Sequence, residues 1–99
     1  MIAFIKKSGN YLETYNPYGK RIAREYNKER ILVYSANIVV TQDGNYIKVY
    51  DEDLDKISKN YLSFDNFLGA AGETFSVQKG NYIITYDKKG NQLGKTYIS

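Results

Sequence analysis

The sequence predicts an all-β fold of three pseudo-equivalent antiparallel meander repeats, each about 35 residues long. Three observations lead to this prediction. The tripeptide Gly-Asn-Tyr occurs three times, starting at Gly9, Gly44 and Gly80. The eighteen residues from each of these glycines align without a gap, and tyrosine recurs at the third, seventh and eighteenth positions. No segment combines helix-capping residues with an apolar helical stripe, so strands are expected throughout.

The aligned copies span residues 9–26, 44–61 and 80–97, and their recurring residues indicate the strands. The tyrosines are Tyr11, Tyr46 and Tyr82, then Tyr15, Tyr50 and Tyr86, then Tyr26, Tyr61 and Tyr97. Aliphatic residues recur at the fourth position (Leu12, Ile47, Ile83) and at the fourteenth (Ile22, Ile57, Leu93). We expect these six aliphatic residues to be buried near a pseudo-axis, and the second set to mark the third strand of each meander.

Two turns are expected in each repeat. The Gly-Asn pair lies between β-prone runs such as Ile38–Gln42 and Tyr46–Tyr50, and glycine at the first turn position favours a two-residue type II′ hairpin. In segments 16–19 and 87–90, Asn or Asp comes first and glycine fourth, which predicts a type I turn followed by a left-handed residue. Segment 51–54 has leucine in place of the glycine and breaks this pattern.

The segments between the copies complete the predicted architecture. Arg30–Ser35 is expected to form a further strand, whereas Phe67–Gly72 is expected to be a bend or loop. Nine to eleven short strands in three units suggest a β-prism, a trefoil-like barrel, or half of a propeller whose ring closes by dimerisation. The length of 99 residues predicts a single domain, residues 1–99. Its repeats are 1–35, 36–70 and 71–99.

Composition excludes many kinds of chemistry. The chain has no cysteine and no histidine, so it cannot form a disulfide, a Cys/His zinc site, a thiol nucleophile or a Ser–His–Asp triad. It also has no glycine-rich phosphate-binding motif. We therefore expect a protein that is not an enzyme and needs no cofactor. No apolar run reaches eighteen residues, and no secretory signal is evident, so the expected location is the cytoplasm, without a membrane partner.

One acidic segment has some features of a calcium loop. Residues 51–55 place carboxylates at alternate positions, as at the start of an EF-hand calcium loop. However, Leu54 stands where an EF-hand loop needs glycine, and the twelfth position is Leu62. A solvated acidic turn is the preferred interpretation, and no metal site is predicted.

The candidate binding residues are cations and tyrosines close to the predicted third strands. They are Tyr18, Arg21, Arg24 and Tyr26 in the first repeat, Lys59 and Tyr61 in the second, and Lys95 and Tyr97 in the third. A cation beside tyrosine rings can hold an anionic or sugar-like ligand by charge, hydroxyl bonding and ring contact. The structural alternative is that the tyrosines are half-buried cross-strand partners and the cations are solvated neighbours.

The segment from Thr41 to Tyr50 resembles the repeating strand of the bulb-type mannose-binding lectins. These lectins carry three Q-x-D-x-N-x-V-x-Y motifs in a three-fold β-prism, so the resemblance implies a prism-like fold and a sugar ligand. Among the residue types of that motif that bind sugar, only Asn10, Asn45 and Asn81 recur in all three copies.

The charge pattern indicates the kind of partner. The repeats carry net charges of +4, −3 and +2, and all three arginines fall in the first. A groove for nucleic acid would be basic along its whole length, whereas charge of alternating sign favours a protein partner or head-to-tail self-association. We therefore expect a non-catalytic, tyrosine-rich binding protein with a macromolecular partner, one form being a phage- or mobile-element-encoded inhibitor of a host enzyme. The basic first repeat is the expected contact with that partner. A lectin-like glycan-binding module, a nucleic-acid-binding module and a homodimer remain open.

Overall fold

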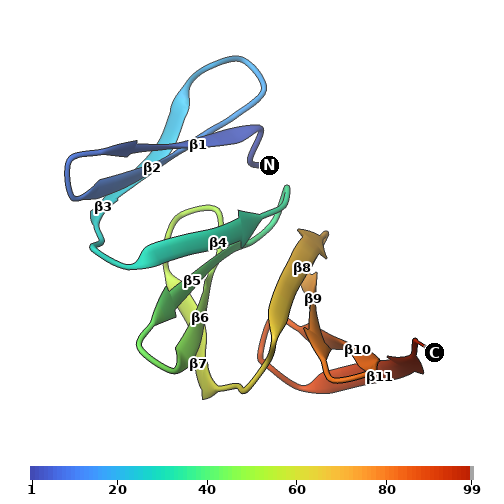
Figure 1. The fold of residues 1–99 in the computed structure, drawn as a ribbon. Helices are drawn as coiled ribbons and strands as arrows, with labels where there is room; N and C mark the ends of the chain where they lie inside the picture. The colour runs from blue at the N-terminus through green and yellow to red at the C-terminus, as the bar shows by residue number, and fades with distance from the viewer. Residues whose placement is uncertain (99) are drawn as a thin grey trace.

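The computed structural model describes residues 1–98, which form eleven antiparallel strands in three sheets (Figure 1). The first sheet contains β1 (Phe4–Ser8), β2 (Tyr11–Tyr15) and β3 (Arg21–Tyr26). The middle sheet contains β4 (Arg30–Tyr34), β5 (Val39–Asp43), β6 (Tyr46–Tyr50) and β7 (Lys56–Tyr61). The last sheet contains β8 (Asn66–Ala71), β9 (Thr74–Lys79), β10 (Tyr82–Asp87) and β11 (Gln92–Tyr97). The all-β prediction is confirmed.

The three sheets follow one another along an elongated molecule, 43 Å by 26 Å by 19 Å. Figure 1 shows the first and last sheets at opposite ends, with the middle sheet between them. The described residues include no helix that could cross a membrane.

The predicted two-residue hairpins form at all three Gly-Asn pairs. Each glycine has a φ of 60°, and the asparagine that follows it has no positive φ, as a type II′ turn requires. The flanking residues pair directly, for example Asp43 with Tyr46. This geometry brings Tyr11, Tyr46 and Tyr82 to the start of a strand in each sheet.

The second turn also has one geometry in all three sheets, which corrects the prediction for segment 51–54. The carboxylate of Asp51 accepts the backbone N–H groups of Asp53 and Asp55, as Asp87 does in its own turn. Leu54 takes the left-handed residue's place with a φ of 63°. Its side chain is only 6% exposed, so burial offsets the backbone strain of about 1 kcal/mol.

The prediction that Phe67–Gly72 is a bend or loop is wrong, because β8 occupies most of this segment and pairs with β9. The predicted strand at Arg30–Ser35 is present as β4 and pairs with β5. Strand pairing therefore runs across the predicted repeat boundaries. Small residues such as Gly69 and Ala70 gave no apolar alternation, which is why the sequence pattern did not indicate β8.

Two buried clusters lie on opposite faces of the middle sheet. On one face, Ile47 and Val49 belong to a cluster with Phe75 and Val77 of the last sheet. On the other face, Val39 joins Ile2, Leu12 and Leu54, and so connects the middle sheet to the first. The core thus consists of two parts, one between the first and middle sheets and one between the middle and last sheets.

The predicted core residues are only partly correct. Leu12 and Ile47 are buried, but Leu93 is 59% exposed. Ile22, Ile57 and Ile83 are only partly buried, and in β10 it is Ile84 that joins the core. Ile84 and Ile83 project from opposite faces of β10, and the face that carries Ile84 packs against the middle sheet. Within residues 1–98, no sheet covers the face that carries Ile83.

Candidate binding surface

Three similar clusters of two tyrosines and one cation stand on the strands that follow the Gly-Asn hairpins. We call them the tyrosine clusters: Tyr11, Tyr26 and Arg24; Tyr46, Tyr61 and Lys59; Tyr82, Tyr97 and Lys95. In each, the two rings meet edge to face, with centroids 5.7, 5.9 and 5.4 Å apart. The cation lies over the inner ring, at 4.0, 4.6 and 4.1 Å from its centroid.

Strand register explains why these side chains meet. The inner and outer tyrosines are direct cross-strand partners, for example Tyr82 with Tyr97. The cation lies two residues before the outer tyrosine, so it projects from the same face of the strand. Edge-to-face rings and a cation over a ring are favourable pairings.

The two tyrosines of a cluster differ in what they leave to solvent. The outer ones, Tyr26, Tyr61 and Tyr97, are 57%, 64% and 60% exposed. The cation of each cluster covers the face of the inner ring. Of the outer rings, that of Tyr26 has Lys28 over it at 5.6 Å, whereas Tyr61 and Tyr97 offer a ring surface and a hydroxyl to solvent. The inner tyrosines thus match the interpretation as sheet-stabilising pairs, and the outer ones are available to a ligand.

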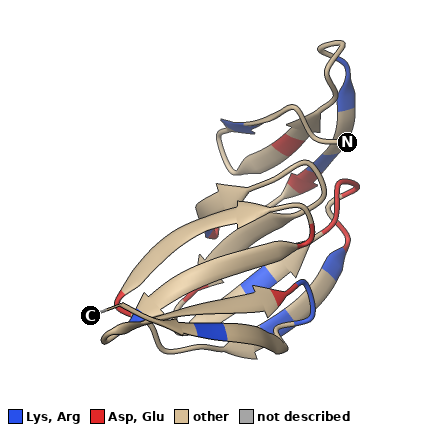
Figure 2. Cartoon of the chain, turned by 90° about the vertical axis from the view of Figure 1, so that its right-hand side faces the viewer, with Lys and Arg blue, Asp and Glu red and all other residues tan. Residues whose placement is uncertain are grey.

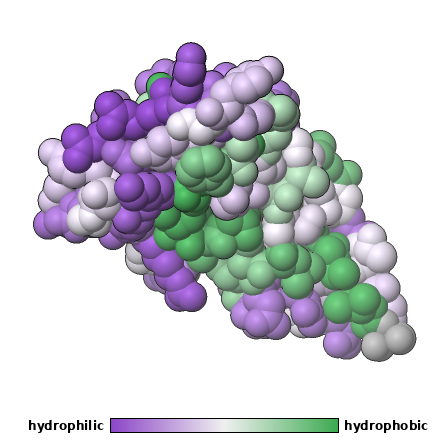
Figure 3. Space-filling view, turned by 90° about the horizontal axis from the view of Figure 1, so that it is seen from above, coloured by the Kyte–Doolittle hydropathy of each residue, from purple (hydrophilic) through white to green (hydrophobic). Residues whose placement is uncertain are grey.

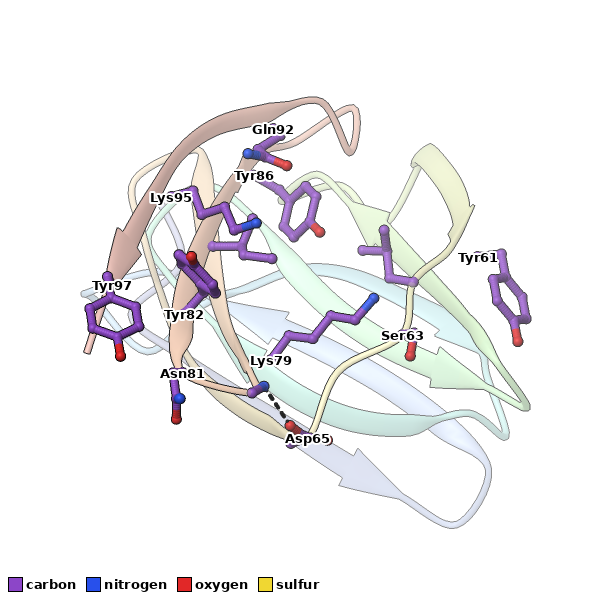
Figure 4. A pocket seen from close by; sticks show the side chains of 13 residues that line it. Tyr61, Ser63, Asp65, Lys79, Asn81, Tyr82, Tyr86, Gln92, Lys95 and Tyr97 are labelled. Atoms are coloured by element: carbon purple, nitrogen blue, oxygen red, sulfur yellow. Dashed lines mark hydrogen bonds between the residues drawn. The ribbon is translucent and has the colours of Figure 1, made fainter. Parts of the chain in front are cut away.

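The third cluster and Tyr61, the outer tyrosine of the second, line one groove between the middle and last sheets (Figure 4). Its volume is about 920 Å³. Tyr82, Lys95 and Tyr97 line it from β10 and β11, while Tyr61 and Ser63 line it from the end of β7 and the connection to β8. Aromatic rings, two lysines and amide groups therefore line a single groove.

The groove is braced at its rim by Asp65, which lies in the connection between β7 and β8. Its carboxylate accepts the backbone N–H of Gly80 at 2.7 Å, drawn in Figure 4, and its own N–H donates to the carbonyl of Gln78. These bonds fix the connection to the β9–β10 hairpin. The rim of the groove is thereby ordered without a ligand.

In the first sheet the candidate residues are divided. Arg21 and Arg24 both contact the buried carboxylate of Glu13, at 3.3 and 3.1 Å. A hydrogen bond from the Tyr15 hydroxyl, together with the two arginines, holds the pKa of Glu13 below its ordinary value. The arginine charges are therefore partly neutralised within the sheet, whereas Tyr18 stands alone at the tip of its turn, 88% exposed.

The middle sheet contains a polar cluster that the sequence did not indicate. Glu29 accepts hydrogen bonds from Thr41 and Tyr50 and forms an ion pair with Lys48. Burial raises the pKa of Glu29, but these three bonds together outweigh it, so that the pKa lies below its ordinary value. The hydrogen bond with Glu29 raises the pKa of Lys48 in turn. Because Glu29 comes from a linker of unremarkable composition, no pattern in the sequence pointed to these contacts.

The acidic turn of residues 51–55 lies beside the N-terminus (Figure 2), where the terminal ammonium group pairs with Glu52. Asp51 uses its carboxylate to close its own turn. In residues 1–98 no group of three acidic side chains is arranged to hold a metal ion.

The structure thus brings three of the eight candidate residues, Tyr61, Lys95 and Tyr97, into one groove. Lys59 stays over Tyr46, and the candidates of the first sheet lie elsewhere. Sequence reasoning did not name Ser63, Asp65 and Lys79 as groove residues, since they carry no repeated signal. Neither the protein-family models nor the curated proteins that we compared with the chain give a match.

Proposed function

We propose that the chain is a non-catalytic binding protein that takes a protein partner in the groove between the middle and last sheets. The observation that carries this proposal is that the third tyrosine cluster and Tyr61 of the second line one groove with an ordered rim. Tyrosine is enriched among residues that dominate protein interfaces, because its ring buries a large area and its hydroxyl still finds a partner. Lys95 adds a positive charge suited to an acidic or carbonyl-rich partner.

Contacts in the first sheet favour this groove over the basic first repeat as the binding site. Glu13 engages Arg21 and Arg24, so their charges are less available to a partner than that of Lys95. We also propose that the three sheets are copies of one unit and are arranged like the blades of a propeller. The proposed location of the protein is the cytoplasm. An inhibitor encoded by a phage or mobile element is one form of the proposed binding protein.

Affinity capture with matched variants tests the proposal. Tagged wild type, Tyr97→Ala and Tyr26→Ala are compared on the same lysate, and captured proteins are identified by mass spectrometry. We expect one captured protein to be retained by wild type and by Tyr26→Ala but lost with Tyr97→Ala. The reason is that Tyr97 lines the groove and Tyr26 does not. Tyr26 is the control, since it is equally exposed and occupies the same register position in the first sheet.

The other functions give different results in the same set of variants. A lectin-like protein would bind immobilised glycans and lose affinity in similar steps at Tyr26, Tyr61 and Tyr97, with a strong gain from multivalent glycans. A nucleic-acid binder would retain labelled oligonucleotides with an affinity that falls steeply with salt. Either result, in the absence of a captured protein that depends on Tyr97, would overturn the proposal.

A further inference from the structure

The two contacts between successive sheets are built in the same way. In each contact, one sheet presents the aliphatic residue at the fourth repeat position, Leu12 in the first sheet or Ile47 in the middle sheet. The next sheet inserts Val39 or Phe75, which occupy one register position, opposite Tyr50 and Tyr86. We call these the receiving face and the inserting face.

The turns between the last two strands of a sheet extend the same contact. The Thr14 hydroxyl donates to the carbonyl of Glu52 at 2.8 Å, and the Ser58 hydroxyl donates to the carbonyl of Lys88 at 2.6 Å. Glu52 and Lys88 are each the second residue of their turn. In both contacts, a hydroxyl of the receiving face thus donates a hydrogen bond to the carbonyl at the second position of the turn in the inserting sheet.

Among residues 1–98, no sheet packs against the inserting face of the first sheet. Phe4 takes the register position of Val39 and Phe75, and its ring stacks on Tyr15 at 4.8 Å. The matching stack of Phe75 on Tyr86 is buried between sheets, with Phe75 only 1% exposed. Phe4, by contrast, is 42% exposed, and the adjoining turn carries the exposed Tyr18.

The receiving face of the last sheet contacts no other sheet in the described part of the chain, residues 1–98. Ile83 and Thr85 occupy the positions of Leu12 and Thr14, and all the side chains of β11 are exposed. Thr85 bonds to Ser76 on this face. The space-filling view of Figure 3 shows apolar surface reaching the C-terminal end of the molecule.

We propose that a second copy of this chain docks head to tail, with the inserting face of the first sheet on the receiving face of the last sheet. The two free faces are the two halves of a contact that the chain already makes twice, and the receiving residues match in type: Ile83 and Thr85 repeat Leu12 and Thr14. Such a contact is heterologous, because each copy contributes a different face. This proposal does not depend on the groove or its partner.

Sedimentation velocity on complementary variants tests this contact. Phe4→Glu places a charge on the inserting face, and Ile83→Lys places one on the receiving face. We expect wild type to associate as its concentration rises, and each variant alone to associate about tenfold or more weakly. An equimolar mixture of the two variants should form a one-to-one complex, since one intact half remains on each. Tyr34→Glu, in the middle sheet and about as exposed as Phe4, is the matched control and should associate as wild type does.

Several outcomes would overturn the head-to-tail contact. Wild type that stays monomeric at the highest concentration reached contradicts it directly. Loss of association in only one of the variants, with no rescue on mixing, indicates that like faces meet instead. Circular dichroism checks that each variant folds. If Phe4→Glu does not, Tyr18→Asp replaces it, because Tyr18 lies at an exposed turn tip and makes no side-chain hydrogen bond there.

Discussion

Asn60 occupies the space that a side chain on Gly90 would need. A Cβ atom built on Gly90 would lie 2.1 Å from Nδ2 of Asn60, which donates a hydrogen bond to the carbonyl of the neighbouring Lys89 at 3.0 Å. Gly90 also has a φ of 85°. The residue therefore meets two demands at once, a left-handed backbone and close approach of the middle sheet to the β10–β11 turn.

Gly90→Ala is expected to lower the free energy of unfolding by more than the same change at Gly19. Gly19 has a φ of 78° and nothing near its Cβ position, so Gly19→Ala should cost only the backbone strain, about 1 kcal/mol. Gly90→Ala should cost about 2–3 kcal/mol, because Asn60 must also move. Urea unfolding measures both. Equal losses of unfolding free energy would show that Asn60 moves away at no cost. In an Asn60→Ala background, Gly90→Ala should cost no more than Gly19→Ala.

At Leu54, unlike at Gly90, a strained left-handed backbone is combined with a buried side chain. Leu54→Gly removes the left-handed strain but also removes a buried side chain that packs with Ile2 and Leu12. Loss of a buried leucine costs about 2–5 kcal/mol, and relief of strain returns about 1 kcal/mol, so we expect a net loss of about 1–4 kcal/mol. A thermal melt that rises on Leu54→Gly would mean that the strain outweighs the packing.

Truncation at two aligned positions should separate core from surface. Ile47→Ala is expected to lower the free energy of unfolding by about 2–5 kcal/mol, because Ile47 is buried between the middle and last sheets. Leu93→Ala should change it by less than about 0.5 kcal/mol, because Leu93 is mostly exposed. Thermal unfolding of both variants in the same buffer measures the difference. A large loss from Leu93→Ala would place Leu93 in a contact with another molecule.

Sequence reasoning reached the turns and the strands that carry a repeated signal. The Gly-Asn pairs and the aligned tyrosines were sufficient to place the hairpins and the cross-strand pairs such as Tyr82 with Tyr97, because local turn chemistry fixes strand register. It failed at Leu54, whose burial against another sheet overrides its poor preference for a positive φ. Tertiary packing is not visible in the local pattern.

The candidate site was predictable only in its repeated part. The tyrosines and cations could be named, but the groove depends on how the middle sheet meets the last one, which no periodicity encodes. Asp65 is a further case, because an isolated aspartate in a linker gives no sign that it bonds to Gly80. The repeat pattern also treats all copies alike, although Ile83 lies at an end of the series and Ile47 at its centre.

The last prediction concerns the stability contributed by Glu29 in acid. The pKa of Glu29 in the folded protein lies below its ordinary value of 4.5, because its bonds with Lys48, Tyr50 and Thr41 outweigh the effect of burial. A carboxyl with a lowered folded pKa binds fewer protons folded than unfolded. Its contribution is therefore present above about pH 4.5 and is lost as the pH falls through the folded pKa.

Glu29→Gln should accordingly melt at a lower temperature than wild type at pH 7, because Lys48 loses its ion pair with Glu29 and keeps only the one with the more exposed Asp43. As the pH falls from 6 towards 3, the difference between the two melting temperatures should shrink, since wild type loses a contribution that the variant never had. Glu13, whose pKa is also lowered, remains in both proteins, so its effect largely cancels in the comparison. A gap between the melting temperatures that stays constant over this range would contradict the role assigned to Glu29.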